Sequence, residues 1–122
     1  MLVPAATNTL IVAGFLPQPI TAGTARNFTV RAIDLYGNTT PAYTGRVHIT
    51  SNDAFSPVLP GDYTFTGSGS GRDNGVHTFT NGVTLVTAGN QTVTATDTVT
   101  STITGSANVT VSAAAATHFT VS

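Results

Sequence analysis

Apolar and polar residues alternate along several short segments of the chain. In the segment 27–34 (NFTVRAID), Phe28, Val30 and Ala32 occupy every second position and predict the buried face, while the residues between them, including Ile33, predict the exposed face. A period of two is typical of a half-buried β-strand. The same pattern predicts strands at 10–13, 43–51, 63–66, 90–97 and 106–112, and two short strands on either side of the Asn81-Gly82 step within 75–89.

Turn-forming residues separate these segments. After 27–34 the chain reads DLYGN, where Asp34 can accept backbone amide bonds while Gly37 and Asn38 tolerate a positive φ. Residues 52–74 are rich in proline and glycine, with a Gly/Ser-rich loop at 67–71, and predict the loop-rich side of the domain. About seven short strands with a turn roughly every ten residues predict an all-β fold, an antiparallel β-sandwich.

The composition supports a single β-domain. A chain of 122 residues suits one hydrophobic core. Threonine makes up about a fifth of the residues, and neither lysine nor glutamate occurs, so β-branched residues replace good helix formers. We expect residues 1–112 to form the sandwich. Because AAAATHFTVS at 113–122 has the same plan as PAATNTLIVAG near the start, we expect 113–122 to be a linker and the first strand of a following repeat.

Three motifs occur in order along the chain: DLYGN at 34–38, YTG at 43–45 and TAGNQT at 87–92. With the strands around them they resemble the bacterial immunoglobulin-like repeats found in tandem in large surface and secreted proteins, related in pattern to the invasin and intimin type. The resemblance implies an immunoglobulin-like sandwich without catalytic residues, with neighbouring repeats of the same chain as partners. It also implies an extracellular or cell-surface location, with the export signal outside this chain.

The charged residues are few and exclude several functions. Four arginines against five aspartates give a net charge of −1, which leaves no basic patch for a nucleic-acid backbone. The longest apolar runs, such as LIVAGFL at 10–16, are too short to span a bilayer, so no membrane insertion is expected. The absence of cysteine removes thiolate metal sites, and we expect no cofactor.

Four aspartates have two interpretations. Asp34, Asp62 and Asp73 fall at predicted turns and Asp97 falls at the end of a strand, where a carboxylate ordinarily accepts backbone amide bonds. The alternative is a calcium site at a junction between repeats, because loop carboxylates, amides and carbonyls suit a hard cation. None of the four has the dense aspartate spacing of a dedicated calcium loop.

The histidines and the hydroxyl residues show no catalytic pattern. His48, His77 and His118 lie on different predicted strands, without the short spacing of a zinc site, and each is interpreted as a half-exposed strand residue. No sharp nucleophile turn accompanies a Ser, His and Asp set. We therefore expect no enzymatic activity.

The Gly-rich loop at 67–75 is the second candidate site. Carbohydrate-binding sandwiches usually display a planar strip of aromatic rings, and this chain has no tryptophan. Tyr36, Tyr63, Arg72 and Asp73 remain as possible ligand-binding residues around the loop.

The sequence thus predicts a non-catalytic structural or spacer repeat of an adhesin-like multidomain protein. Two alternatives stay open. The first is an accessory ligand-binding or carbohydrate-binding module of a secreted enzyme. The second is a self-assembling filament subunit in which a terminal strand completes the sheet of a neighbouring copy. Because the predicted strands carry so few charges at their edges, lateral self-association is also possible.

Overall fold

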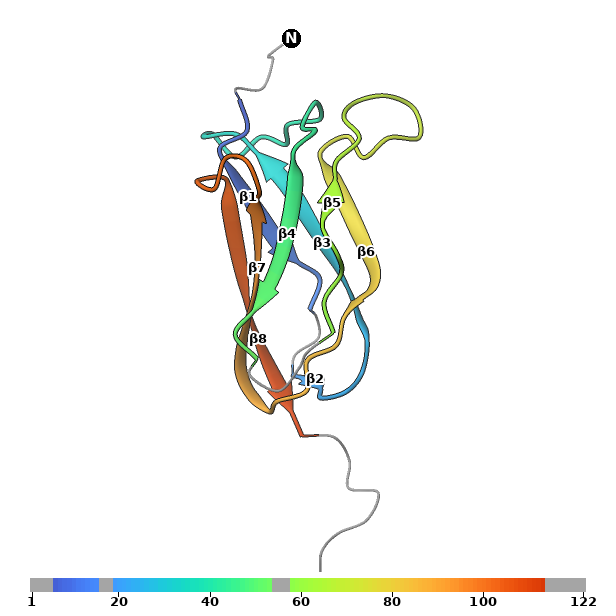
Figure 1. The fold of residues 1–122 in the computed structure, drawn as a ribbon, viewed down its shortest axis with the longest axis vertical. Coiled ribbons are helices and arrows are strands. Elements are labelled where there is room, and N and C mark those ends of the chain that lie inside the picture. The colour runs from blue at the N-terminus through green and yellow to red at the C-terminus, as the bar shows by residue number, and fades with distance from the viewer. Residues whose placement is uncertain (1–5, 16–18, 54–57, 114–122) are drawn as a thin grey trace, which may run out of the picture.

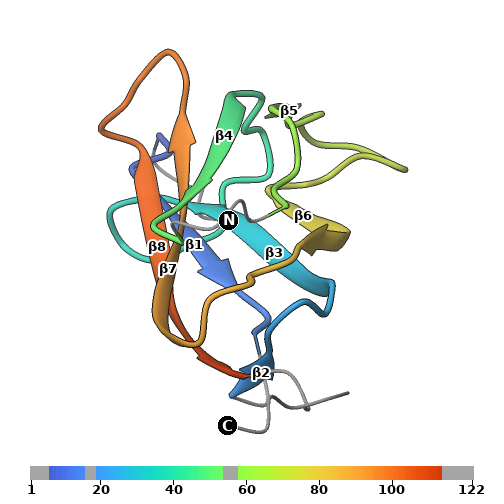
Figure 2. The same ribbon diagram turned by 60° about the horizontal axis from the view of Figure 1, so that its bottom comes forward.

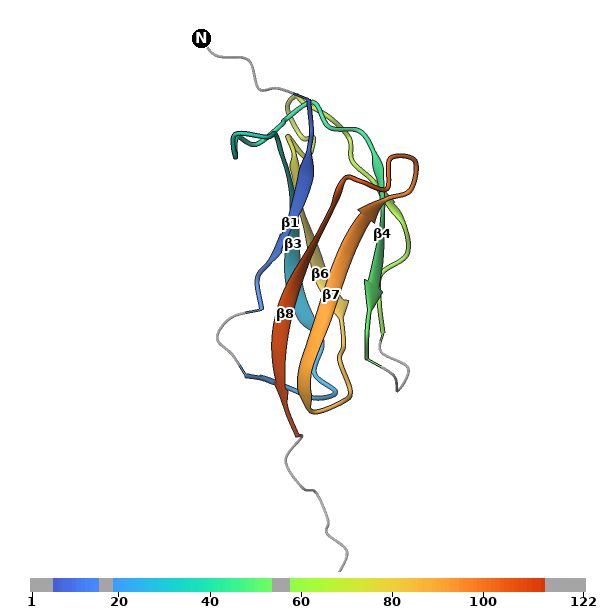
Figure 3. The same ribbon diagram turned by 90° about the vertical axis from the view of Figure 1, so that its left-hand side faces the viewer.

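The computed structural model describes residues 6–15, 19–53 and 58–113, which form a two-layered β-structure (Figure 1). Its strands are β1 (Thr9–Ala13), β2 (Ile20–Thr21), β3 (Arg26–Ile33), β4 (Arg46–Ser51), β5 (Tyr63–Thr64), β6 (Val76–Val83), β7 (Gly89–Asp97) and β8 (Thr104–Ser112). Strands β1-β3-β6 form one sheet and β2-β8-β7-β4-β5 form the other. The two sheets face each other as a β-sandwich (Figures 2 and 3). Within the described residues there is no helix that could cross a membrane.

The predicted alternation is confirmed in the central strands. Val30 and Ala32 of β3, Val93 and Ala95 of β7 and Val109 of β8 are all fully buried between the sheets. Threonine or another polar residue occupies the positions between them, with side chains on the outer faces. The hydrophobic effect therefore fixes the register of each strand, because a shift by one residue would turn its buried side chains outward.

Aromatic rings form one continuous series of contacts through the core. Each ring lies within 5.7 Å of the next, measured between ring centroids, in stacked or edge-to-face geometry. Such pairs contribute about 0.5–1.5 kcal/mol each beyond the burial of their area. In order, the rings belong to Phe15, Phe28, Phe79, Tyr63, Phe65 and Tyr43.

The strand inventory differs from the expectation of about seven antiparallel strands. The described residues contain eight, and the short strand β2 pairs with β8 in parallel, Ile20 opposite Val111. The backbone amide of Ala22 then donates to the carbonyl of Ser112, at 2.9 Å. Two residues are too few to show a period-two pattern, so this pairing could not be predicted from alternation.

Three other expectations were wrong in detail. The Asn81-Gly82 step does not divide a strand, because Asn81 adopts a φ of 50° within β6 and the register against β3 shifts between Arg26 and Phe28. Such an irregularity absorbs an extra residue without ending the strand. Strand β4 begins at Arg46 rather than residue 43, and Ile33 is buried rather than exposed, since the chain turns back after it and Ile33 pairs with Thr39.

The chain passes through the sandwich from one pole to the other. Strand β1 begins at the upper pole of Figure 1, and β8 ends at the lower pole with Ser112. The upper pole, called the N-terminal pole below, also carries the connections 34–45, 65–75 and 98–103 (Figure 1). The lower pole is called the C-terminal pole. Of the predicted linker and next strand at 113–122, residues 114–122 lie outside the described residues.

Strand β1 of one sheet lies directly against strand β8 of the other. The hydroxyl of Thr9 donates to the carbonyl oxygen of Thr104 at 2.6 Å. Gly105 lies against the backbone of Leu10, and a Cβ at residue 105 would overlap the Leu10 carbonyl. The contact between the two sheets therefore requires a glycine at position 105.

We expect the substitution Gly105→Ala to lower the free energy of unfolding by about 1–3 kcal/mol or more, because the added methyl group must push β1 and β8 apart. Chemical denaturation of the full chain measures the effect. The matched control is Gly61→Ala, where an added Cβ meets no atom within 4 Å and a change within about 0.5 kcal/mol is expected. Equal effects at both positions would contradict the close approach.

Candidate functional site

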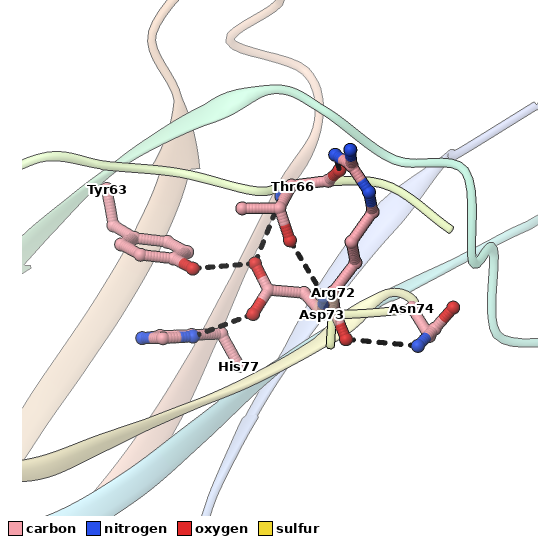
Figure 4. Close-up of polar contacts among 6 residues, drawn as sticks. All are labelled: Tyr63, Thr66, Arg72, Asp73, Asn74 and His77. Carbon is pink, nitrogen blue, oxygen red and sulfur yellow. Dashed lines mark hydrogen bonds and ion pairs between the residues drawn. The ribbon is translucent and has the colours of Figure 1, made fainter. Parts of the chain in front are cut away.

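Three of the four residues predicted for the ligand loop come together in the connection between β5 and β6 (Figure 4). The hydroxyl of Tyr63 donates to Oδ2 of Asp73 at 2.7 Å. Arg72 donates from Nη1 to the carbonyl oxygen of Thr66 at 2.9 Å. Tyr36, the fourth predicted residue, lies in a different connection, the turn that follows β3, where its ring is exposed.

Asp73 is the centre of this cluster. Its Oδ2 also accepts the backbone amide of Thr66 at 3.0 Å, and its Oδ1 lies 2.9 Å from Nδ1 of His77. The backbone amide of Asp73 donates in return to the hydroxyl of Thr66, at 2.8 Å. Both carboxylate oxygens are thus engaged, and 12% of the side chain is exposed. The reciprocal bonds between Thr66 and Asp73 join the two ends of the loop.

Strands β5 and β6, which belong to different sheets, carry the aromatic part of the cluster. Tyr63 of β5 stacks on His77 of β6, with ring centroids 3.7 Å apart and planes inclined by 17°. His77 in turn meets the edge of Phe79, two residues further along the same strand. The cluster is therefore continuous with the aromatic core.

The local environment shifts two acid–base equilibria in opposite directions. Burial is the largest influence on Tyr63, and together with its bond to the Asp73 carboxylate it raises the pKa of Tyr63 to about 12. Burial also opposes the ionisation of Asp73, but the hydrogen bonds from Tyr63, His77 and Thr66 outweigh it and lower the pKa of Asp73 below its ordinary value. Near neutral pH the cluster therefore contains a carboxylate and a neutral phenol.

Two residues of the cluster were missed in the sequence. Asn74 adopts a φ of 53°, and its side-chain amide donates to the carbonyl oxygens of Gly69 and Arg72 while its Oδ1 accepts the amide of Gly69. Thr66 supplies the hydroxyl and the amide that hold Asp73. The Asn74-Gly75 step was a local sign of a turn, whereas nothing in the sequence pairs Thr66 with Asp73.

The hydrogen bonds of this arrangement serve to hold the loop in one conformation. The polar atoms of Tyr63, Thr66 and Asp73 bind one another, and the carboxylate is ionised and held by donors. A raised Tyr63 pKa works against its use as a base. The cluster therefore fixes the course of the Gly-rich connection from Thr66 to Asn74.

The other calcium candidates lie apart from this cluster. Asp34 accepts the amides of Tyr36 and Asn38 through Oδ1, each at 2.9 Å. Asp62 contacts Nδ1 of His48 at 2.6 Å on the surface beside β4. In the ranges 6–15, 19–53 and 58–113, no three side chains of the metal-ligating types converge.

Asp97, the fourth candidate, closes the turn between β7 and β8. It accepts the amides of Val99 and Thr100, each at 2.8 Å, and the hydroxyl of Tyr43 at 2.5 Å. Burial opposes its ionisation, but the amide of Thr100, the Tyr43 hydroxyl and the amide of Val99 prevail and lower the pKa of Asp97. Burial and the same contact raise the pKa of Tyr43.

Asp53 was not singled out in the sequence. Like Asp97, it accepts backbone amides of a connection, in this case the one between β6 and β7. It is buried and accepts the amides of Val86 and Thr87 at 2.8 and 3.0 Å, and the Thr87 hydroxyl at 2.6 Å. These partners are more than thirty residues away in the sequence, so only the folded topology brings them together.

The predicted separation of the histidines is seen for two of them. His48 belongs to β4 and His77 to β6, in different sheets, and each faces its own aspartate. His118 lies outside the described residues.

Comparison with known proteins finds similarity at the level of the fold. No protein-family model matches the chain, and a search of curated proteins gives no match. Among solved structures, the chain is similar to part of the surface layer protein SbsC, in a structure of its domains 1–6. The TM-score is 0.51 and the sequence identity 24%, and the match covers 93% of this chain but 14% of the other. The likeness therefore concerns one small part of a larger protein.

We expect Asp73→Asn to lower the free energy of unfolding at pH 7 by about 1–3 kcal/mol, because donors in a half-buried network lose their charged acceptor. Since folding lowers the pKa of Asp73 from its ordinary 3.8, the stabilisation is complete above that value and is lost as the pH falls through the lower pKa of the folded state. Urea denaturation between pH 3 and 8 measures this, at pH values chosen to bracket the usual pKa of about 4.

The control for this prediction is Asp62→Asn, at a carboxylate that is more exposed than that of Asp73. Its effect should stay within about 0.5 kcal/mol, as is usual for surface substitutions. An Asp73→Asn deficit that persisted unchanged at pH 3 would show that the charge of Asp73 is not what holds the loop.

Proposed function

We propose that this chain is a non-catalytic, immunoglobulin-like structural domain of a multidomain cell-surface protein, and that it acts as a spacer. The observation that carries the proposal is the path of the chain, which enters at one pole of the sandwich and leaves at the other (Figures 1 and 3). Domains with this path extend end to end when they are joined in series. Each one then adds its long axis to the length of the array.

The strand order supports the immunoglobulin-like assignment. In constant-type immunoglobulin domains, strands A, B and E share one sheet, and C, F and G share the other. When the strands of this chain are matched in order, β1-β3-β6 corresponds to A-B-E and β4-β7-β8 corresponds to C-F-G. In this correspondence β2 is a second part of the first strand that has crossed to the opposite sheet.

The pairing of β2 with β8 suits a domain that carries load. Strands β2 and β8 are parallel, and tension applied through the two ends of the chain pulls them in opposite directions along their axes. Their hydrogen bonds and the packing of buried Ile20 are then loaded together rather than one after another. A domain used as a spacer needs this resistance.

The cell-surface location is supported by the kind of protein that shares the fold. That protein is described as a surface layer protein with several domains, of which this chain matches a small part. A repeated structural role in such a protein agrees with a sequence that is rich in threonine and poor in charge.

The absence of catalysis is supported by the use made of the carboxylates. Asp34, Asp53, Asp73 and Asp97 each accept backbone amides of a connection. The accessory binding module has less support, because Tyr63 and Asp73 of its predicted loop bind each other.

The test is single-molecule stretching of a tandem array of the full chain. We expect a distinct unfolding force for each copy, and we expect Ile20→Ala to lower it. The control, Val83→Ala, removes a fully buried side chain from β6, which pairs with β3 in the other sheet and not with β2 or β8. Both variants should have a lower free energy of unfolding, by about 2–5 kcal/mol for Ile20→Ala. For the same loss of free energy, the unfolding force should fall less in the control than in Ile20→Ala.

Two results would count against the spacer proposal. One is unfolding without a resolvable force, which would leave the domain unable to carry load. The other is an equal loss of force in the two variants after correction for stability, which would remove β2 and β8 from the load-bearing path.

A further inference from the structure

The most exposed apolar side chains of the described chain are concentrated at the N-terminal pole. Leu35 and Tyr36 are 69% and 76% exposed, and Val99 is 88% exposed. The first two lie in the turn after β3 and the third in the turn between β7 and β8. Isolated exposed apolar residues are common on proteins, but a group on one pole points to an interaction surface.

Buried carboxylates hold both turns in place. Oδ1 of Asp34 accepts the amide of Tyr36 at 2.9 Å, and Oδ1 of Asp97 accepts the amide of Val99 at 2.8 Å. The carboxylates point inward, so the tips carry apolar side chains without the charge of either aspartate. Because the backbone of each tip is fixed beforehand, little conformational entropy is lost when another surface covers it.

The two turns flank the place where the chain enters the sandwich. The amide of Asn8 donates to the carbonyl oxygen of Ile33 at 2.8 Å, next to the first turn. The hydroxyl of Thr9 donates to the carbonyl oxygen of Thr104, next to the second turn. The point at which the chain enters the sandwich, at Asn8 and Thr9, is therefore close to both turns.

The C-terminal pole has a matching arrangement. Val58 and Val86 are exposed there, and Asp53 holds the amide of Val86. The carbonyl of Ser112, at the end of β8, accepts the amide of Ala22, and the next amide, that of Gly23, donates to the carbonyl of Leu85. The connection that carries Val86 is therefore close to the place where the chain leaves the sandwich.

We propose that the turns 34–38 and 98–103 form a docking surface for the C-terminal pole of a second domain of this kind, joined in series ahead of this one. Leu35, Tyr36 and Val99 pack against the residues equivalent to Val58 and Val86 of that domain. The inference rests on the proposed spacer function and adds the contact that sets the angle between successive domains. The interface is head to tail, so it repeats along an array.

The experiment uses two copies of the full 122-residue chain that are expressed separately and then joined into one polypeptide by protein ligation. Linking the copies gives the poles an effective concentration of about millimolar, so a weak contact is populated. With isotope label in the second copy alone, nuclear magnetic resonance compares the amide shifts of residues 34–38 and 98–103 with those of the single chain. Apart from the residues next to the new peptide bond, we expect shift changes in these two turns and none on the outer face of β6.

Matched variants identify the contact. Leu35→Ser, Tyr36→Ser and Val99→Ser combined in the second copy should abolish the shift changes, and Val58→Ser with Val86→Ser in the first copy should do the same. The control Val76→Ser changes an exposed valine of β6 that belongs to neither turn, and it should leave the shift changes intact. Unaltered turn shifts in the linked pair, or shifts that survive both sets of variants, would overturn the docking surface.

Small-angle scattering of the same linked pair separates this inference from the spacer function. A pair that is extended end to end but shows no shift changes overturns the docking surface and leaves the spacer proposal standing. A pair folded side by side overturns both. If a single chain at high concentration shows the same turn shifts and the Val58→Ser, Val86→Ser variant keeps them, the N-terminal poles bind each other and the head-to-tail contact is wrong.

Discussion

The connections of this sandwich depend on carboxylates that point inward. Asp34, Asp53, Asp73 and Asp97 each accept backbone amides from the connection that they close. A buried carboxylate is tolerable only when donors replace its water, and backbone amides at turns supply them. The aspartates therefore give fixed shapes to the connections that they close, and they do so without placing their charges on the outer surface.

The core and the connections form one network. The aromatic series reaches the Asp73 cluster through Tyr63 and the Asp97 turn through Tyr43, whose hydroxyls donate to the two carboxylates. Each of these tyrosines packs in the core with its ring and holds a connection with its hydroxyl. Packing between the sheets and order at the N-terminal pole are thereby coupled, and this coupling is the property that a spacer with defined angles to its neighbours needs.

Sequence patterns were reliable where a period or a local turn carries the information. The alternation at 27–34 and 90–97 predicted the buried faces of β3 and β7, and DLYGN predicted the turn held by Asp34. They failed where the determining contact is distant in sequence. The parallel β2–β8 pair joins residues about ninety apart, and Asp53 binds residues across the sandwich. Tyr63, Arg72 and Asp73 lie together at the loop with which the sequence analysis grouped them, whereas Tyr36 lies in another turn. The composition of a turn does not determine which other turns it contacts.

The most direct test of this account is amide hydrogen exchange in the native protein at neutral pH. The amides of Tyr36, Thr66, Val86 and Val99 all lie outside strands, and each donates to an aspartate. We expect these four amides to exchange far more slowly than the same residues in an unstructured peptide, with protection that approaches that of the strand amides. Exchange at the peptide rate would mean that the carboxylates do not hold the connections.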